Sequence, residues 1–92
     1  MNIHVEYSAQ SRLCAGCSEE SFQIEEGAGL VDLLKAIAER HGAAMRDLLF
    51  YENGALSRSM LYFVDDEQAD AQMPCLLTDG ARVSLLSPVS GG

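Results

Sequence analysis

The sequence predicts one α+β domain, a mixed sheet of four or five strands with one main helix packed across one face. Three observations lead to this prediction. The chain has 92 residues, which is room for a single domain. Near both ends apolar residues alternate with polar ones, the period of half-buried strands, and between them one stretch has the period of an amphipathic helix. Strands, a helix and further strands in this order are typical of the α+β class.

The N-terminal part predicts a hairpin. Residues 3–7 alternate between apolar and polar side chains, so they form a half-buried strand. Residues 8–20 are polar and contain a glycine, and we expect them to be a connecting loop. Residues 22–24 then form a second short strand that pairs with the first.

Residues 30–41 predict the main helix, because five apolar residues recur with helical spacing on one side. They are Leu30, Leu33, Leu34, Ile37 and Ala38. Gly42 is placed to end the helix in a left-handed conformation. The start is weakly capped, since Ala28 and Gly29 stand where Ser, Thr or Asp is preferred.

Turn signals divide the rest of the chain. Residues 43–50 predict a second helical turn, and residues 59–64 are rich in strand formers and predict a third strand. Residues 65–67 stop that strand and predict a further turn, and Pro74 ends any structure begun at residue 69. The last strand is 83–89, after turns at Asn53-Gly54 and Asp79-Gly80, with Pro88 marking an edge or an exit.

Composition limits the kinds of partner. Six basic residues against fourteen acidic ones give a formal charge of −8. A nucleic-acid binder or a protein of anionic membrane surfaces needs the opposite balance, so we expect neither partner. The N-terminus has no signal pattern and no apolar run approaches a membrane span, which predicts a cytoplasmic protein with basic partners.

The three cysteines leave alternatives open. Cys14 and Cys17 form a C-x-x-C, which fits a redox pair, half of a zinc site, or two small residues in a turn. Cys75 and the histidines His4 and His41 do not complete a zinc set at a recognised spacing, so we expect no metal site and two surface histidines. No catalytic set is visible either, which predicts that the chain is not an enzyme.

The C-terminus carries the sharpest chemical signal. The chain ends in Gly91-Gly92. Because glycine has no Cβ, such a tail can extend through a narrow channel and bring its carboxylate to a nucleotide phosphate in another protein. A carboxylate activated as an acyl-adenylate then accepts a sulfur, oxygen or nitrogen nucleophile. Two terminal glycines also fit a frayed polar end without function.

Together these features resemble the MoaD/ThiS sulfur-carrier family, most closely the molybdopterin synthase small subunit. The resemblance rests on the strand and helix order, the segment 7–12 at the exit of the first strand, the turn at 77–80 and the ending 88–92. It implies a ubiquitin-like β-grasp domain over residues 1–86. It also implies that residues 87–92 form an extended, flexible C-terminal tail.

The resemblance also implies a function. A ubiquitin-activating-like adenylyltransferase would use ATP, in trans, to adenylate the carboxylate of Gly92. A sulfur donor, a persulfide enzyme or sulfide, would convert it to a thiocarboxylate that an acceptor such as the molybdopterin synthase large subunit consumes. No cofactor would be bound by the chain itself. The partner-binding residues would be Arg12, Leu86, Pro88, Val89, Ser90 and Gly91.

Two of these assignments have ordinary alternatives. Leu86 breaks the alternation after Leu85, which fits an exposed partner anchor or partial burial at a sheet edge. Arg12 fits a partner contact or a solvated loop residue. The pathway also stays open, since cysteine, thiamin or other thio-metabolite synthesis uses similar carriers. A protein modifier joined to lysine through Gly92, or a plain interaction module, would carry the same fold.

Overall fold

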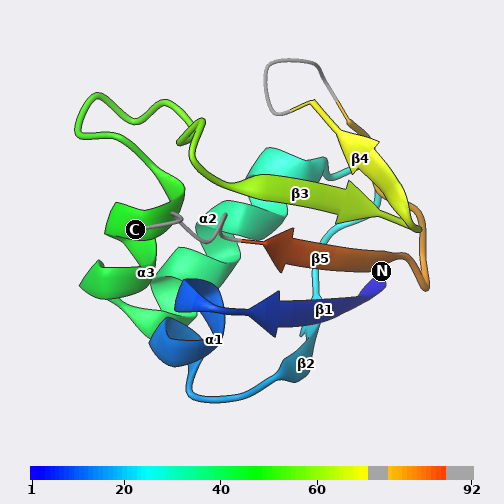
Figure 1. Cartoon of the computed structure of the whole chain (residues 1–92). Coiled ribbons are helices and arrows are strands. Elements are labelled where there is room, and N and C mark those ends of the chain that lie inside the picture. The colour runs from blue at the N-terminus through cyan, green and yellow to red at the C-terminus, as the bar shows by residue number, and fades with distance from the viewer. Residues whose placement is uncertain (71–74, 87–92) are drawn as a thin grey trace.

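A computed structural model describes residues 1–70 and 75–86, and it contains the mixed sheet that the sequence predicts. The sheet has five strands in the order β2-β1-β5-β3-β4 (Figure 1). Only β1 and β5 are parallel, and the other neighbours are antiparallel. The strands are β1 (Asn2–Ser8), β2 (Glu19–Gln23), β3 (Leu61–Val64), β4 (Glu67–Ala69) and β5 (Arg82–Leu86). Pro74 and residues 87–92 lie outside the described part of the chain.

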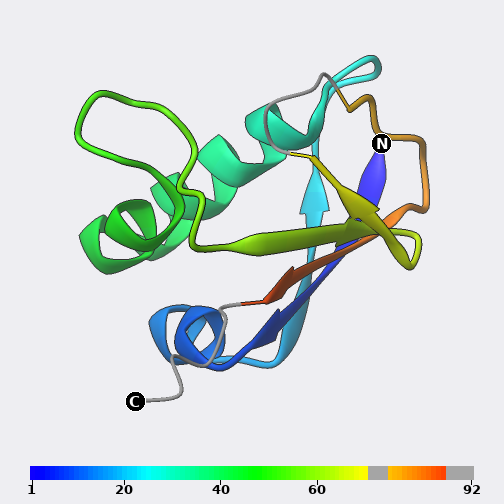
Figure 2. The same ribbon diagram turned by 45° about the horizontal axis from the view of Figure 1, so that its top comes forward.

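The main helix α2 (Leu30–His41) has the predicted bounds and lies across one face of the sheet (Figure 2). All five residues of its predicted apolar stripe are buried. They pack with the inward side chains of the two parallel strands, Ile3 and Val5 of β1 and Val83 and Leu85 of β5, all with no exposed surface. The core therefore forms where the sequence periodicity places it.

The prediction of a loop over residues 8–20 is wrong, because this segment contains α1 (Gln10–Ala15) and the beginning of β2. α1 has only six residues, too few for an apolar stripe to repeat. Gly16 follows it with a left-handed backbone, φ 75° and ψ 10°, and ends it. Ser11 is fully buried, so the helix is attached to the domain by a polar side chain.

The region after residue 50 differs from the prediction in two places. β3 begins at Leu61 and not at residue 59, and the turn predicted over 65–67 covers only Asp65 and Asp66, because Glu67 already belongs to β4. Asp65 and Asp66 both have positive φ, 51° and 71°, which is the backbone of a tight two-residue hairpin turn. That turn sends the chain straight back along β3, so residues 67–69 pair with it.

Gly42 ends α2 but is not left-handed helical. Its φ is 91° and its ψ is −163°. The same residue begins α3 (Ala43–Leu49), the second helical segment that the sequence predicts. Its N–H donates to the carbonyl of Ala38 (2.8 Å) and its own carbonyl accepts from Arg46 (3.1 Å), so the two helices share this junction. At the other end of α2, the Gly29 N–H donates to the Asp32 carboxylate (2.9 Å), whereas Gly29 itself has no side chain to cap the helix.

Among residues 1–70 and 75–86, no helix is long and apolar enough to cross a membrane.

Candidate functional site

The predicted tail begins where β5 ends, in the middle of the sheet. β5 lies between β1 and β3, and its last residue, Leu86, pairs with Ser8 on one side and Leu61 on the other. The tail residues themselves, Pro88 to Gly92, lie outside the described part of the chain. β5 pairs with a neighbouring strand along each of its edges, so the position of Leu86, after which the tail begins, is held by the centre of the sheet.

α1 is attached to this end of β5 by one buried hydroxyl. The Ser11 Oγ accepts the Ser8 N–H (3.1 Å) and lies within hydrogen-bonding distance of the carbonyl oxygens of Ser8 (2.8 Å) and Leu85 (3.0 Å). A buried hydroxyl with three such neighbours has no unpaired polar group and holds the helix in one position. The side chains next to Ser11 on α1 are therefore held beside the start of the tail.

Four exposed side chains lie on the elements that meet here: Arg12, Leu13, Leu61 and Leu86, together called the tail-root surface. Leu86 is 39% exposed, as an anchor residue would be, and it lies on the central strand rather than at an edge. Leu13 is 77% exposed and Leu61 37% exposed, and sequence reasoning missed both. Arg12 is exposed and forms no ion pair with any residue in the described ranges. Exposed apolar side chains at one end of a sheet are typical of a docking surface.

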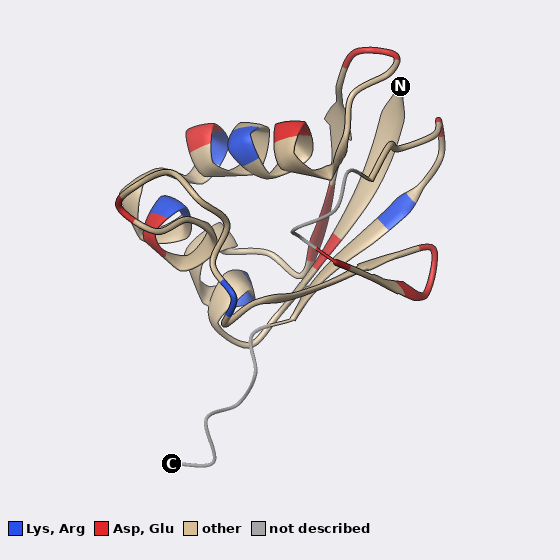
Figure 3. Ribbon diagram, turned by 90° about the horizontal axis from the view of Figure 1, so that it is seen from above, with Lys and Arg blue, Asp and Glu red and all other residues tan. Residues whose placement is uncertain are grey.

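The acidic residues lie on other parts of the chain, including turns, α2 and strands β1 and β2 (Figure 3). The turn Asp65-Asp66 is at the opposite end of β3 from Leu61. The tail-root surface is thus apolar with one cation, in a chain whose formal charge is −8.

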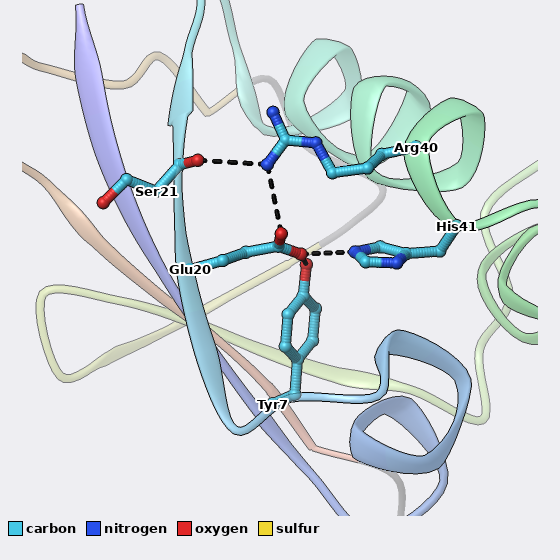
Figure 4. Close-up of polar contacts among 5 residues, drawn as sticks. All are labelled: Tyr7, Glu20, Ser21, Arg40 and His41. Carbon is cyan, nitrogen blue, oxygen red and sulfur yellow. Dashed lines mark hydrogen bonds and ion pairs between the residues drawn. The ribbon is translucent and has the colours of Figure 1, made fainter.

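A polar cluster holds the C-terminal end of α2 against the first hairpin (Figure 4). The Glu20 carboxylate accepts hydrogen bonds from the Tyr7 hydroxyl and from the Arg40 guanidinium (3.1 Å), and it pairs with Nε2 of His41. Arg40 also lies over the ring of Phe22, 3.8 Å from its centroid. The prediction that His41 is a surface residue is wrong, since only 12% of its side chain is exposed. Sequence spacing gave no signal, because Glu20 is 21 residues away.

The cluster keeps Glu20 ionised. Burial alone would raise its pKa, but hydrogen bonds from Tyr7, His41 and Arg40 favour the charged form and hold the pKa of Glu20 below its usual value. The pKa of Tyr7 is raised, first by burial and then by its hydrogen bond to this carboxylate. Tyr7 therefore stays neutral and serves as a donor, so the cluster is a structural clamp.

One group of possible metal ligands occurs among the described residues: His4, Glu6 and Glu19, whose donor atoms lie within 4.8 Å of one another. They are on the exposed face of β1 and β2. Glu6 is already engaged by Arg82 (3.8 Å) and by the Ser84 hydroxyl (3.3 Å). These side chains are exposed and Glu6 already has two partners, so the short distances between them do not by themselves assign a metal site.

Comparison with known proteins decides the family. A family model described as the ThiS family matches residues 5–92. The chain belongs to the ThiS family. It is 32% identical to the molybdopterin synthase sulfur carrier subunit of Chlamydomonas reinhardtii over 92 residues, which is all of both chains.

Solved structures confirm the ubiquitin-like β-grasp fold. SAMP1 from Haloferax volcanii superimposes with a TM-score of 0.90 at 23% identity, over all of both chains. A putative molybdopterin converting factor subunit 1 from Pyrococcus furiosus gives a TM-score of 0.73 at 26% identity, over 97% of this chain and 99% of that one. This ThiS-family chain is accordingly a small carrier protein and not an enzyme, as the sequence predicts.

Proposed function

We propose that this ThiS-family chain carries sulfur as a thiocarboxylate on Gly92 and delivers it in molybdopterin synthesis. The observation that carries the proposal is the full-length identity of 32% to a molybdopterin synthase sulfur carrier subunit, with no part of either chain left unmatched. The shared length matters because the tail ending in Gly91-Gly92 is included in the match. We expect the protein to act in the cytoplasm.

The chemistry needs little from the carrier itself. A Gly92 carboxylate oxygen attacks the α-phosphorus of ATP in the activating enzyme, and pyrophosphate leaves. Sulfide then attacks the acyl-adenylate carbonyl and AMP leaves, which gives the thiocarboxylate. In this proposal the tail residues Pro88, Val89, Ser90 and Gly91 bind the partner enzymes together with Gly92.

The domain supplies recognition. We assign docking of the activating and acceptor enzymes to the tail-root surface, because Leu61 pairs with Leu86 where the tail begins and Ser11 bonds α1 to the same end of β5. Arg12 adds one cation beside these side chains.

This assignment has a matched test within the chain. Leu13→Ser should raise the KM of the activating enzyme several-fold, since a fully desolvated apolar anchor carries a large share of binding energy. Leu76→Ser is the control, because Leu76 is 73% exposed but lies beside Gly29 at the start of α2. Both variants should unfold within about 0.5 kcal/mol of the native chain, since surface changes cost little. Equal KM values for the two variants would refute a docking role for α1.

The second candidate is a protein modifier, the function suggested by the name of the small archaeal modifier protein 1 among the structural neighbours. That neighbour is 20% identical, which shows the fold alone. Both candidates share activation of Gly92 and differ in the nucleophile that follows. Lys35 is the only lysine, so chains of the modifier joined to itself would have one attachment point.

The deciding experiment is the intact mass of the full chain after incubation with a cognate activating enzyme, ATP and sulfide. We expect a gain that corresponds to one oxygen-to-sulfur exchange, absent when Gly92 is deleted. The molybdopterin branch is then tested by adding the acceptor subunit with the cofactor precursor and following sulfur loss from the carrier. No exchange, with an active enzyme and a competent control carrier, would contradict the carrier proposal and favour the modifier.

A further inference from the structure

Two thiols lie at the end of α1, beside the tail-root surface. Cys14 is in the last turn of the helix, and Cys17 follows one residue after Gly16. Both side chains are partly buried and pack against the hydrophobic core. Both thiols therefore contact the same hydrophobic core.

The backbone between them turns back on itself. Gly16 is left-handed, and its N–H donates to the carbonyl of Arg12 (2.9 Å). This is the αL form of helix end, in which the chain folds over the last turn and does not continue along the axis. Only Ala15 and Gly16 separate the two cysteines, so their Cα atoms are at most about 10 Å apart. A disulfide spans Cα atoms about 4.4–6.8 Å apart. Cys17 belongs to no helix or strand, so it can adjust without breaking a ladder.

Cys17 also has a defined neighbour. The pKa of Tyr7 is raised first by burial, then by Glu20, and a thiolate at Cys17 adds to this effect. Cys17 thus lies near the Tyr7 hydroxyl, and it packs against the same hydrophobic core as Cys14.

We propose that Cys14 and Cys17 form a reversible intramolecular disulfide, a redox-modified site at the end of α1. The oxidant is a low-molecular-weight disulfide of the glutathione class. One cysteine thiolate attacks it and releases one glutathione thiolate, and the second cysteine thiolate then displaces the other from the mixed disulfide. One S–S bond forms in the protein and one is lost from the oxidant, two electrons pass to the oxidant, and the two cysteine protons end on the released thiols.

The position of the pair separates it from a redox catalyst. Thioredoxin-type thiols are activated at the start of a helix, where backbone N–H groups favour a thiolate. Here the two cysteines lie at the C-terminal end of a helix. The site is therefore a crosslink that fixes the end of α1, and α1 carries Arg12 and Leu13. A crosslink that fixes α1 would therefore control the tail-root surface. This consequence rests on the proposed function, whereas the crosslink itself does not.

The test uses the full chain with Cys75→Ser, so that only two thiols remain. In glutathione buffers of rising oxidised fraction, we expect a loss of two hydrogens in the intact mass, with no glutathione retained. Cys14→Ser and Cys17→Ser in the same background should each retain one glutathione and lose no hydrogens. Retention of glutathione on both cysteines of the parent chain at every ratio would overturn the proposal, as would a disulfide-linked dimer in place of the intramolecular bond.

A second measurement tests what the crosslink does. Hydrogen exchange at the Leu13 and Gly16 amides, which bond to Ala9 and Arg12, should slow on oxidation. Unchanged exchange would overturn a fixed α1. The two-hydrogen loss should be the same when Gly92 is deleted, so a failure of sulfur loading and a failure of the disulfide are separate results.

Discussion

Replacing Ala9 with glycine should stabilise the protein, because Ala9 holds a backbone conformation that suits glycine. Its φ is 53° and its ψ is −125°. In this region the Cβ of an L-residue collides with its own backbone, so a non-glycine residue there carries strain. Ala9 is exposed and joins β1 to α1, so removing its methyl group leaves no cavity.

The expected gain follows from two opposing effects. Strain at a sparsely populated φ/ψ position costs about 1–3 kcal/mol. Glycine makes the unfolded chain more flexible, which costs about 0.4–1 kcal/mol. Their difference predicts that Ala9→Gly raises the free energy of unfolding by about 1 kcal/mol, which corresponds to a rise in Tm of about 4–8 °C for a domain of this size.

Urea unfolding followed by far-ultraviolet circular dichroism would measure this gain. The midpoint should rise while the slope m stays unchanged, since no surface is added or removed. The control is Ala44→Gly, at an exposed position inside α3, where glycine should cost about 1 kcal/mol. If both substitutions destabilise the protein equally, Ala9 is not strained and the reasoning fails.

Three other substitutions test separate contacts. Glu20→Gln should cost about 1–3 kcal/mol at pH 7. Because the pKa of Glu20 is depressed, its contribution to stability is present above the unfolded value of about 4.5. It is lost as the pH falls through the folded value, so the difference in unfolding free energy between the variant and the native chain should shrink as the pH is lowered below that range. Exposed Glu19→Gln is the control, and a gap that stays constant with pH would contradict the clamp. Gly29→Ala places a Cβ 2.9 Å from the carbonyl oxygen of Cys75, so we expect a loss of about 1–3 kcal/mol in thermal unfolding, and an unchanged Tm would mean that no such contact exists. Asp66→Gly, at φ 71°, should stabilise the hairpin turn by about 0.5–1 kcal/mol in urea, and a loss would refute the positive φ.

The sequence predicts best the elements that are defined by burial on one face. α2 has its predicted bounds because every apolar position of its stripe is buried. β1 and β5 are found for the same reason, since Val5 and Val83 point inward with a period of two. The first hairpin is also confirmed as an antiparallel pair.

The missed elements are those whose position depends on polar contacts. α1 is attached through the hydroxyl of Ser11, and no periodic pattern records a single buried serine. β4 consists largely of exposed polar residues at the edge of the sheet, so alternation is absent and only the turn at Asp65-Asp66 makes it a strand. The contact of His41 with Glu20 brings together distant parts of the chain, which a local pattern cannot show.

The same distinction applies to the candidate site. The ending Gly91-Gly92 is enough to suggest the proposed chemistry without any structure, because that proposal uses only the terminal carboxylate. The docking surface depends on the fold, since Leu13, Leu61 and Leu86 come from three elements that meet only when β5 lies between β1 and β3. A carrier with this topology keeps its charged turn at the opposite end of β3 from its apolar docking side chains. The acidic turn can therefore attract basic partners from a distance while it stays in water. Burying those charges in the interface would cost binding energy.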